Sequence, residues 1–446
     1  MTNEQTLRDK VSAHFPALQA ELETLVRIPS VSADAFDQAH VAASAQHVAD
    51  LFTAQGIADV KVVTAGQSRP AVIARIPAPA GKPTVLLYAH HDVQPPGDSA
   101  DWETDPFEPV IVGERMFGRG AADDKAGIIA HLGALRVLGD DLGVGVTLFI
   151  EGEEEIGSPY FTEFLHKFKE ELRADAIVVA DSANWRVGVP ALTTSLRGLV
   201  DCEVDVEVLS HAVHSGMFGG PVLDSITMMS RLIASLHDAN GDVAVPGLVH
   251  GIEPQVDYDE ADFRADAGVL PETQLAGTGP ISARLWTKPA IGVIGFDAPT
   301  VALSSNTLIP KTTAKLSMRI APGQEPAAAL AALRAHLEAN APFGARVTVR
   351  DGELGKPFQA PADSATMRAA RSAFATAWGV DPVDIGIGGS IPFIADLLEV
   401  YPDAAILVTG VEDPDSRAHG ANESVHLGEL QKVVLAEALL LANLAE

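Results

Sequence analysis

TVLLYAHHD, residues 84–92, joins a short apolar run to three polar residues. Residues 84–89 are apolar on both faces, which is typical of a buried parallel strand in an α/β sheet. Similar runs occur at 144–150, 176–180 and 405–409, and helical patterns cover 125–138 and 158–172. Near the start, apolar residues spaced by three or four over 4–27 predict one or two amphipathic helices, interrupted at Pro16. Together these patterns predict an α/β fold with a mainly parallel sheet.

The pattern changes near residue 198. Over 200–208 apolar residues alternate strictly with acidic ones, which predicts a half-buried strand whose acidic face is in water. A helix over 222–237, strands near Ile291 and over 313–320, a helix over 326–340 and a strand over 346–350 follow. This β-α-β-β-α-β order is typical of a ferredoxin-like α+β domain. Because a helix over 366–378 and the strand over 405–409 return to the first style, we expect domain 196–355 to be inserted between 1–195 and 356–446.

Composition excludes several classes of protein. The chain has 446 residues, 47% of them apolar, and 31 basic against 60 acidic residues give a net charge of −29. Intrinsic disorder is incompatible with that apolar content, and the acidic excess argues against binding to nucleic acid or anionic membranes. No apolar run reaches the roughly 18 residues of a membrane span, and the polar opening MTNEQTLRDK predicts a cytoplasmic location. A single cysteine, Cys202, excludes thiolate-rich metal sites, so histidine and carboxylate must hold any metal.

Polar residues gather where the predicted parallel strands end. Taken singly, each has an ordinary structural explanation; His-x-Asp is a weak signal, and an aspartate before a helix is a common cap. The carboxyl ends of parallel strands, however, meet at one edge of a sheet, where ligands bind. The candidates there are His90 with Asp92, Glu154 or Glu155, Asp181 and His419, and Asp123 joins them from the glycine-rich turn that leads into the helix over 125–138. Histidine with carboxylates suits Zn²⁺, Mn²⁺ or Co²⁺. Two histidines and three carboxylates are more protein ligands than the roughly three that one catalytic zinc takes. A pair of ions sharing one carboxylate would use them all.

Four motifs make the sequence recognisable. Residues 88–95 (YAHHDVQP), 118–125 (GRGAADDK), the pair Glu154-Glu155, and 213–216 (VHSG) resemble those of the M20 family of co-catalytic metallopeptidases. Within that family the chain looks most like the branch of carnosinase and cytosolic non-specific dipeptidase. The motifs follow the family order from RIPS at 27–30 to His419.

The resemblance implies a role for each candidate. His90 and Asp181 would bind one metal, Glu155 and His419 the other, and Asp123 would bridge them. Asp92 would orient His90, and Glu154 would be the general base. Glu153 extends the family's glutamate pair to a triplet, and the following Ile156-Gly157-Ser158 sets the register. Two Zn²⁺ or Mn²⁺ ions per subunit, possibly Co²⁺, are implied as cofactors.

The resemblance also implies how substrate is held. The inserted domain would be a lid that forms a homodimer, and His214 would reach the partner's active site and stabilise the oxyanion. Arg319 would bind the substrate's carboxylate, and Gly389 and Ser390 would line a substrate loop. The expected reaction is dipeptide hydrolysis, since dipeptidases of the family tend to have Asp at the position of Asp181. The alternatives are an N-acyl amino acid deacylase or desuccinylase and, more remotely, a non-catalytic binding protein on this scaffold.

Overall fold

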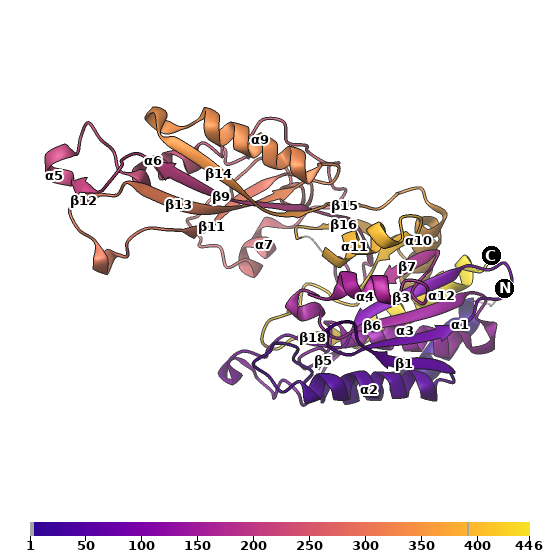
Figure 1. Cartoon of the computed structure of the whole chain (residues 1–446). Coiled ribbons are helices and arrows are strands. Elements are labelled where there is room, and N and C mark those ends of the chain that lie inside the picture. Colours follow the sequence, from indigo (N-terminus) through magenta and orange to yellow (C-terminus); the bar gives the residue numbers. More distant parts are fainter. Residues whose placement is uncertain (1–3, 390–391) are drawn as a thin grey trace. The chain divides into compact units, whose positions relative to one another are not determined.

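The computed structural model describes residues 4–389 and 392–446. The chain forms two compact units (Figure 1). The first unit comprises Met1–Thr194, Ala360–Ile385 and Asp396–Glu446, and the second comprises Ser195–Gln359 and Gly386–Ala395. The second unit therefore interrupts the first twice. Its short second segment, Gly386–Ala395, falls within the range 356–446 that was expected to belong to the same domain as 1–195. Backbone and side-chain bonds of Arg197 to the carbonyls of Ile387 and Gly388 hold this segment in the second unit.

The largest sheet in the described part of the chain has nine strands, with parallel strands at its centre and antiparallel strands on both sides. Its central strands are β6 (Gly145–Glu151), β3 (Thr84–His90), β7 (Ala176–Val179) and β17 (Ala405–Val408), in that order, and each neighbouring pair is parallel. These are the four strands that the apolar runs predict. Strands β1 (Asp59–Val63) and β2 (Ala71–Ile76) add antiparallel pairs beside β6, while β8 (Ala191–Leu196) with β15 (Phe358–Gln359) and β16 (Val383–Ile387) extends the other side.

Helices bury the central strands. Helix α1 (Glu4–Val26) is a single helix that includes Pro16, and it packs with α12 (Leu427–Leu444) against α3 (Lys125–Leu138), which also contacts β3. Nearly all of α3 is buried as a result. The other helices are α2 (Ala39–Ala54), α4 (Phe161–Lys167), α10 (Ala365–Trp378) and α11 (Pro392–Val400), and β18 (Ser424–His426), β5 (Arg115–Phe117) and β4 (Val110–Val112) form a small sheet. The expected helix over 158–172 was too long at both ends, since α4 has only seven residues.

The second unit has the expected ferredoxin-like order. Its elements are β9 (Gly198–Glu207), α6 (Ser225–Ala234), β11 (Ala290–Phe296), β13 (Lys311–Ile320), α9 (Pro326–Ala339) and β14 (Arg346–Gly355). The antiparallel sheet runs β11-β13-β9-β14, and α6 and α9 pack on it around an apolar core that includes Cys202. Two short helices, α7 (Glu260–Asp266) and α8 (Ile281–Trp286), precede β11, and a ribbon of β10 (Val213–His214) and β12 (Thr307–Leu308) leads into α5 (Ser215–Phe218).

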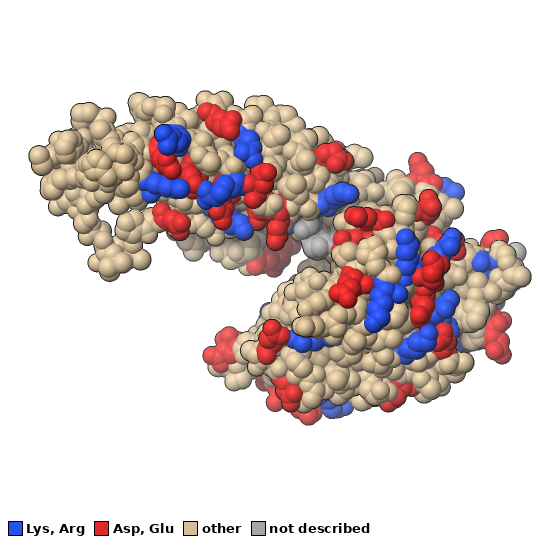
Figure 2. Space-filling model, in the orientation of Figure 1, with Lys and Arg blue, Asp and Glu red and all other residues tan. Residues whose placement is uncertain are grey.

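The acidic face of β9 is only partly the solvated surface that the alternation predicts, since Glu203 is exposed and Glu207 is half-buried. Asp201 and Asp205 are only 5% and 4% exposed. Lys315 Nζ lies 3.0 Å from Asp201, Lys311 Nζ lies 2.8 Å from Asp205, and Arg350 also pairs with Asp205. Long basic side chains from β13 and β14 cover the carboxylates because cross-strand neighbours project to the same face. Figure 2 shows basic and acidic groups side by side over this sheet.

No helix in the described part of the chain is both long enough and apolar enough to cross a membrane.

Candidate metal centre

The ends of the parallel strands bring polar residues to one edge of the sheet. His90 is the last residue of β3 and is paired in register with Glu151, the last residue of β6. Asp181 is the second residue after the end of neighbouring β7, and His419 lies in the loop after β17. Asp123 comes just before α3, the helix that packs against β3. Loops after parallel strands are the usual position of an α/β ligand site.

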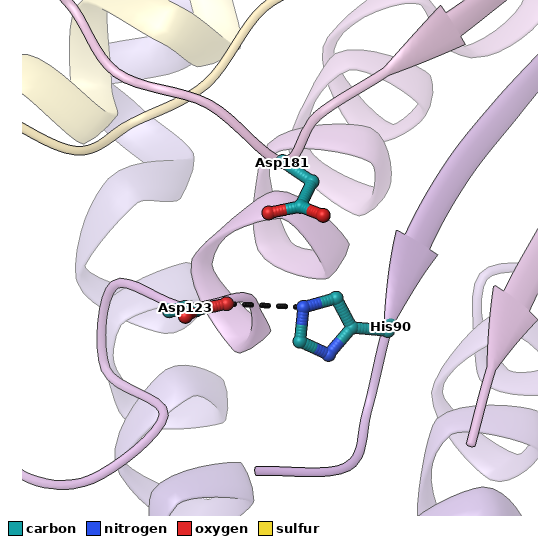
Figure 3. Close-up of side chains that lie close together, drawn as sticks. All are labelled: His90, Asp123 and Asp181. Atoms are coloured by element: carbon teal, nitrogen blue, oxygen red, sulfur yellow. Dashed lines mark hydrogen bonds and ion pairs between the residues drawn. The ribbon is translucent and has the colours of Figure 1, made fainter. Parts of the chain in front are cut away.

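Asp123 is the centre of this arrangement. Its Oδ1 lies 3.0 Å from His90 Nε2, and its Oδ2 lies 3.0 Å from His419 Nε2. Asp181 completes one group with His90 and Asp123, and Glu155, whose Oε2 is 3.2 Å from His419 Nε2, completes the other. Figure 3 shows the side chains of the first group turned toward one another. Within each group the possible ligand atoms lie within 4.8 Å of one another, so each group could hold one cation and Asp123 could bridge the two.

Asp92 contacts residues of both groups. The Nδ1 of His90 lies 3.1 Å from the backbone oxygen of Asp92 and 3.5 Å from its carboxylate Oδ1. That carboxylate also accepts hydrogen bonds from the backbone N–H groups of Glu154 and Glu155, at 3.2 and 3.1 Å. His91 turns away, and its Nε2 bonds to the Pro70 carbonyl at 2.8 Å. Asp92 therefore orients one histidine and, beyond its expected role, anchors the turn that presents the glutamates.

The glutamates after β6 have different surroundings. Glu151 accepts a hydrogen bond from the Tyr88 hydroxyl at 2.6 Å. Glu153 accepts the backbone N–H groups of Arg69 and Tyr160 at 2.9 and 3.1 Å, which is a structural role. Glu155 belongs to the second donor group, and Glu154 lies between these two residues on the same turn.

Gln94 is a supporting residue that sequence reasoning missed. Its backbone N–H donates to Glu155 Oε1 at 3.0 Å, and its side-chain amide donates to Glu155 Oε2 at 2.8 Å. These bonds orient the carboxylate that faces His419. Gln94 lies inside the motif at 88–95, but a neutral amide is not an obvious partner of a metal ligand and therefore gave no separate signal.

The site concentrates negative charge in a poorly solvated place. Burial, followed by the charge of Asp181, raises the pKa of Glu154 to about 9, and burial with the charge of Asp123 raises the pKa of Asp181 to about 7. Hydrogen bonds with Asp123 and Glu155 raise the pKa of His419 to about 11. The carboxylates around His419 thus favour positive charge at this place, which a divalent ion would supply. Mixed imidazole and carboxylate donors suit borderline or hard divalent ions.

The remaining predicted residues belong to the second unit. His214 is exposed at the end of β10, and its Nδ1 accepts the backbone N–H of Gly216 at 3.0 Å. Arg319 is half-buried on β13, opposite Leu199 of β9. Gly389 lies in the loop after β16, whereas Ser390 lies outside the described residues. Sequence reasoning missed Arg197, which is 7% exposed and donates to the Gly388 carbonyl at 2.9 Å.

Known proteins share this sequence and fold. The model of "Peptidase family M20/M25/M40" matches residues 86–443. A cysteinylglycine-S-conjugate dipeptidase of Corynebacterium striatum is 36% identical over 365 residues, which are 80% of each chain. A Cys-Gly metallodipeptidase of Saccharomyces cerevisiae is 27% identical and covers 94% of this chain and 93% of its own. The crystal structure of human carnosine dipeptidase 1 has a TM-score of 0.76 at 25% identity, covering 99% and 98% of the two chains.

These matches confirm the resemblance that the four motifs indicate, including its dipeptidase branch. The family match extends from β3 to α12 and includes every residue of both donor groups. This chain is a member of peptidase family M20/M25/M40.

Proposed function

We propose that the protein hydrolyses the peptide bond of dipeptides with two divalent metal ions. The observation behind this proposal is that the two carboxylate oxygens of Asp123 each lie 3.0 Å from a different histidine. His90 and Asp181 would complete one metal site, and Glu155 and His419 the other. Zn²⁺ or Mn²⁺ are the proposed ions, with Co²⁺ as a substitute, since the donors are imidazole and carboxylate. When bound, such ions lower the pKa of water and polarise the scissile carbonyl.

Glu154 is the proposed general base. Asp92 fixes the turn through the N–H groups of both Glu154 and Glu155, so the two side chains leave adjacent points of one rigid segment. Glu155 is oriented by Gln94, and Glu154 is left for proton transfer beside the donor groups. Two bound cations would lower the raised pKa of Glu154, so that its carboxylate would accept the proton of the attacking water and deliver it to the departing amine, as general acid-base catalysis requires.

The second unit would recognise the substrate. Because His214 Nδ1 accepts a backbone hydrogen bond, a neutral imidazole has its proton on Nε2 and can donate it to a developing oxyanion. Arg319 would bind the substrate's carboxylate. Arg319 is paired in register with Leu199 of β9. Arg197, which lies just before β9, donates to the carbonyl of Gly388, next to the glycine loop that is proposed to contact substrate.

A homodimer formed through the second unit is part of the proposal. Met217 and Phe218, in the helix that follows His214, are 76% and 50% exposed. Exposed apolar side chains of this size are typical of a contact surface. His214 would then serve the partner's site. Mixed dimers of His214→Ala and Glu154→Ala chains should recover activity that neither variant has alone, and an absence of recovery would refute the shared site.

The decisive experiment compares substrate classes on the metal-free protein. Zn²⁺, Mn²⁺ or Co²⁺ is added back, and hydrolysis is measured for Cys-Gly, a Cys-Gly S-conjugate and β-Ala-His, and for N-acetyl and N-succinyl amino acids. Turnover of dipeptides that depends on added metal is the expected result. Turnover confined to the acylated amino acids would favour the deacylase instead, and the absence of metal-dependent turnover on every compound would leave a binding protein. The reaction is proposed to take place in the cytoplasm.

A further inference from the structure

A buried ion pair lies behind the metal centre and is unused by the proposed mechanism. Arg119 Nη1 and Glu423 Oε2 are 2.6 Å apart, and the two side chains are 1% and 0% exposed. The partners are 304 positions apart in the chain. Arg119 belongs to the loop that contains Asp123, and Glu423 belongs to the loop that contains His419. The pair therefore joins the two segments that supply the bridging carboxylate and one histidine.

Glu423 holds the backbone of the Asp123 loop. Its Oε1 accepts the N–H groups of Ala122 and Asp123 at 3.0 and 3.1 Å, and its Oε2 accepts that of Gly120 at 3.0 Å. With Arg119, four donors converge on one carboxylate. A single side chain thus determines where the backbone of Asp123 lies and how the residue is turned toward the two histidines.

Arg119 holds the His419 loop in return. Its Nη2 donates to the carbonyl oxygens of His419 and Gly420, both at 3.1 Å. His419 has a φ of 62°, in the left-handed region that residues with a Cβ rarely adopt. Such a conformation persists where surrounding contacts enforce it. The two bonds from Arg119 hold the backbone on the C-terminal side of His419 and thereby restrict the direction in which its imidazole leaves the backbone.

We infer that Arg119 and Glu423 are positioning residues that set the distance between Asp123 and His419, and with it the affinity of the ion shared by Asp123, Glu155 and His419. This inference rests on the proposed metal site. Residues that hold metal ligands in place commonly alter metal affinity by about 10–100-fold when they are changed. A purely structural ion pair would instead alter stability and leave the affinity of the folded protein unchanged.

The test is a Co²⁺ titration of the metal-free protein, followed by visible absorption, with circular dichroism to verify folding. Arg119→Lys keeps the charge opposite Glu423 but removes the fork that reaches two carbonyls. Glu423→Gln removes the negative charge opposite Arg119 and replaces one acceptor oxygen with an amide donor. If this variant does not fold, Glu423→Asp, which keeps the charge but shortens the side chain, is titrated instead. His419→Ala identifies the equivalent of Co²⁺ that depends on this loop.

Arg136→Lys is the matched control. Arg136 makes a bidentate pair with Glu21 at 2.9 and 3.0 Å, also lies in the first unit, and bonds to neither ligand loop. We expect Arg119→Lys and the Glu423 variants to weaken, by about 10–100-fold, the equivalent that His419→Ala removes, with a changed absorption spectrum. Arg136→Lys should bind both equivalents normally.

The outcomes separate the two proposals. Folded Arg119 and Glu423 variants that bind both equivalents with unaltered affinity and spectrum would overturn the positioning role while leaving the metal site intact. Failure of the unaltered protein to bind Co²⁺ would overturn the proposed metal site itself, and the inference with it.

Discussion

Removing divalent ions is expected to lower the melting temperature of the first unit. Both donor groups lie in that unit, and ligands that bind only the folded state stabilise it by mass action. Chelation should therefore destabilise the first unit, and adding back Zn²⁺ or Mn²⁺ should restore it. The second unit contains neither donor group among its described residues, so its unfolding transition should be much less sensitive to metal.

The size of the shift follows from the structure. An ion present at a hundred times its dissociation constant contributes about 2.7 kcal/mol, so two ions contribute about 5 kcal/mol. The first unit spans about 270 residues, and its entropy of unfolding near 60 °C is about 0.6 kcal/mol/K. The quotient predicts a rise of about 9 °C on loading both sites, and about half of that if only one site is filled.

Differential scanning calorimetry in chelator and in excess Zn²⁺ measures this shift. His419→Ala should keep about half of it, because the group of His90, Asp123 and Asp181 is retained. Asp123→Asn should lose most of the shift, since both groups share that carboxylate. Asp384→Asn, which breaks an ion pair with Arg371 elsewhere in the first unit, should show the full rise. A full shift in Asp123→Asn, or none in the unaltered protein, would refute the shared-carboxylate reasoning.

Three further measurements address the base, a buried histidine and the second unit. Glu154→Gln should keep the metal-induced shift while kcat for a dipeptide falls by about 10²–10⁴-fold, and loss of the shift would make Glu154 a ligand. Burial lowers the pKa of His131, but its bonds to Glu437 at 2.8 and 2.9 Å outweigh burial and leave that pKa raised. The stabilisation by this pair should be complete below about pH 6.5 and should disappear as the pH rises through the raised pKa of His131. The unaltered chain should therefore be more stable to urea than His131→Gln at pH 6, and this difference should shrink toward pH 10. A difference that does not change with pH would contradict the prediction. Leu333→Ala, at a fully buried position of α9, should destabilise the second unit by about 2–5 kcal/mol and leave the metal-induced shift of the first unit unchanged. Calorimetry measures both effects, and an unchanged second unit or an altered metal-induced shift would contradict the prediction.

The site was predictable where chemistry is local in the chain. Apolar runs at 84–89 and 144–150 mark buried strands, and polar residues directly after them must lie at one sheet edge if the strands are parallel. The structure brings four candidate ligands together at that edge, and Asp123 joins them from the segment before α3. Supporting residues were less accessible. Gln94 has no ligand chemistry of its own, and Glu423 acts on Asp123 from 300 positions away. Such contacts depend on how loops cross, which periodicity does not report.

Surface and boundaries show the same division. The alternation over 200–208 correctly predicts a strand with one apolar face, because side-chain direction has a period of two. It does not predict that Asp205 is buried, since the covering Lys311 and Arg350 come from separate strands whose register is a tertiary property. For α4, apolar spacing suggested a helix to residue 172, whereas the regular helix ends at Lys167. Some of the acidic residues of β9 are paired with lysine and arginine on the second unit's sheet, which leaves the net charge of the chain unchanged.

The sequence alone determined the class of fold, the chemical nature of the donors and the family, because strand burial, residue type and motif order are written along the chain. Only the tertiary structure decided which oxygen of Asp123 faces which histidine. It also decided that one buried ion pair holds both ligand loops. The physical reason is that a metal site depends on distances of a few ångströms between loops remote in sequence, and those distances arise only when strands, helices and buried hydrogen bonds pack together.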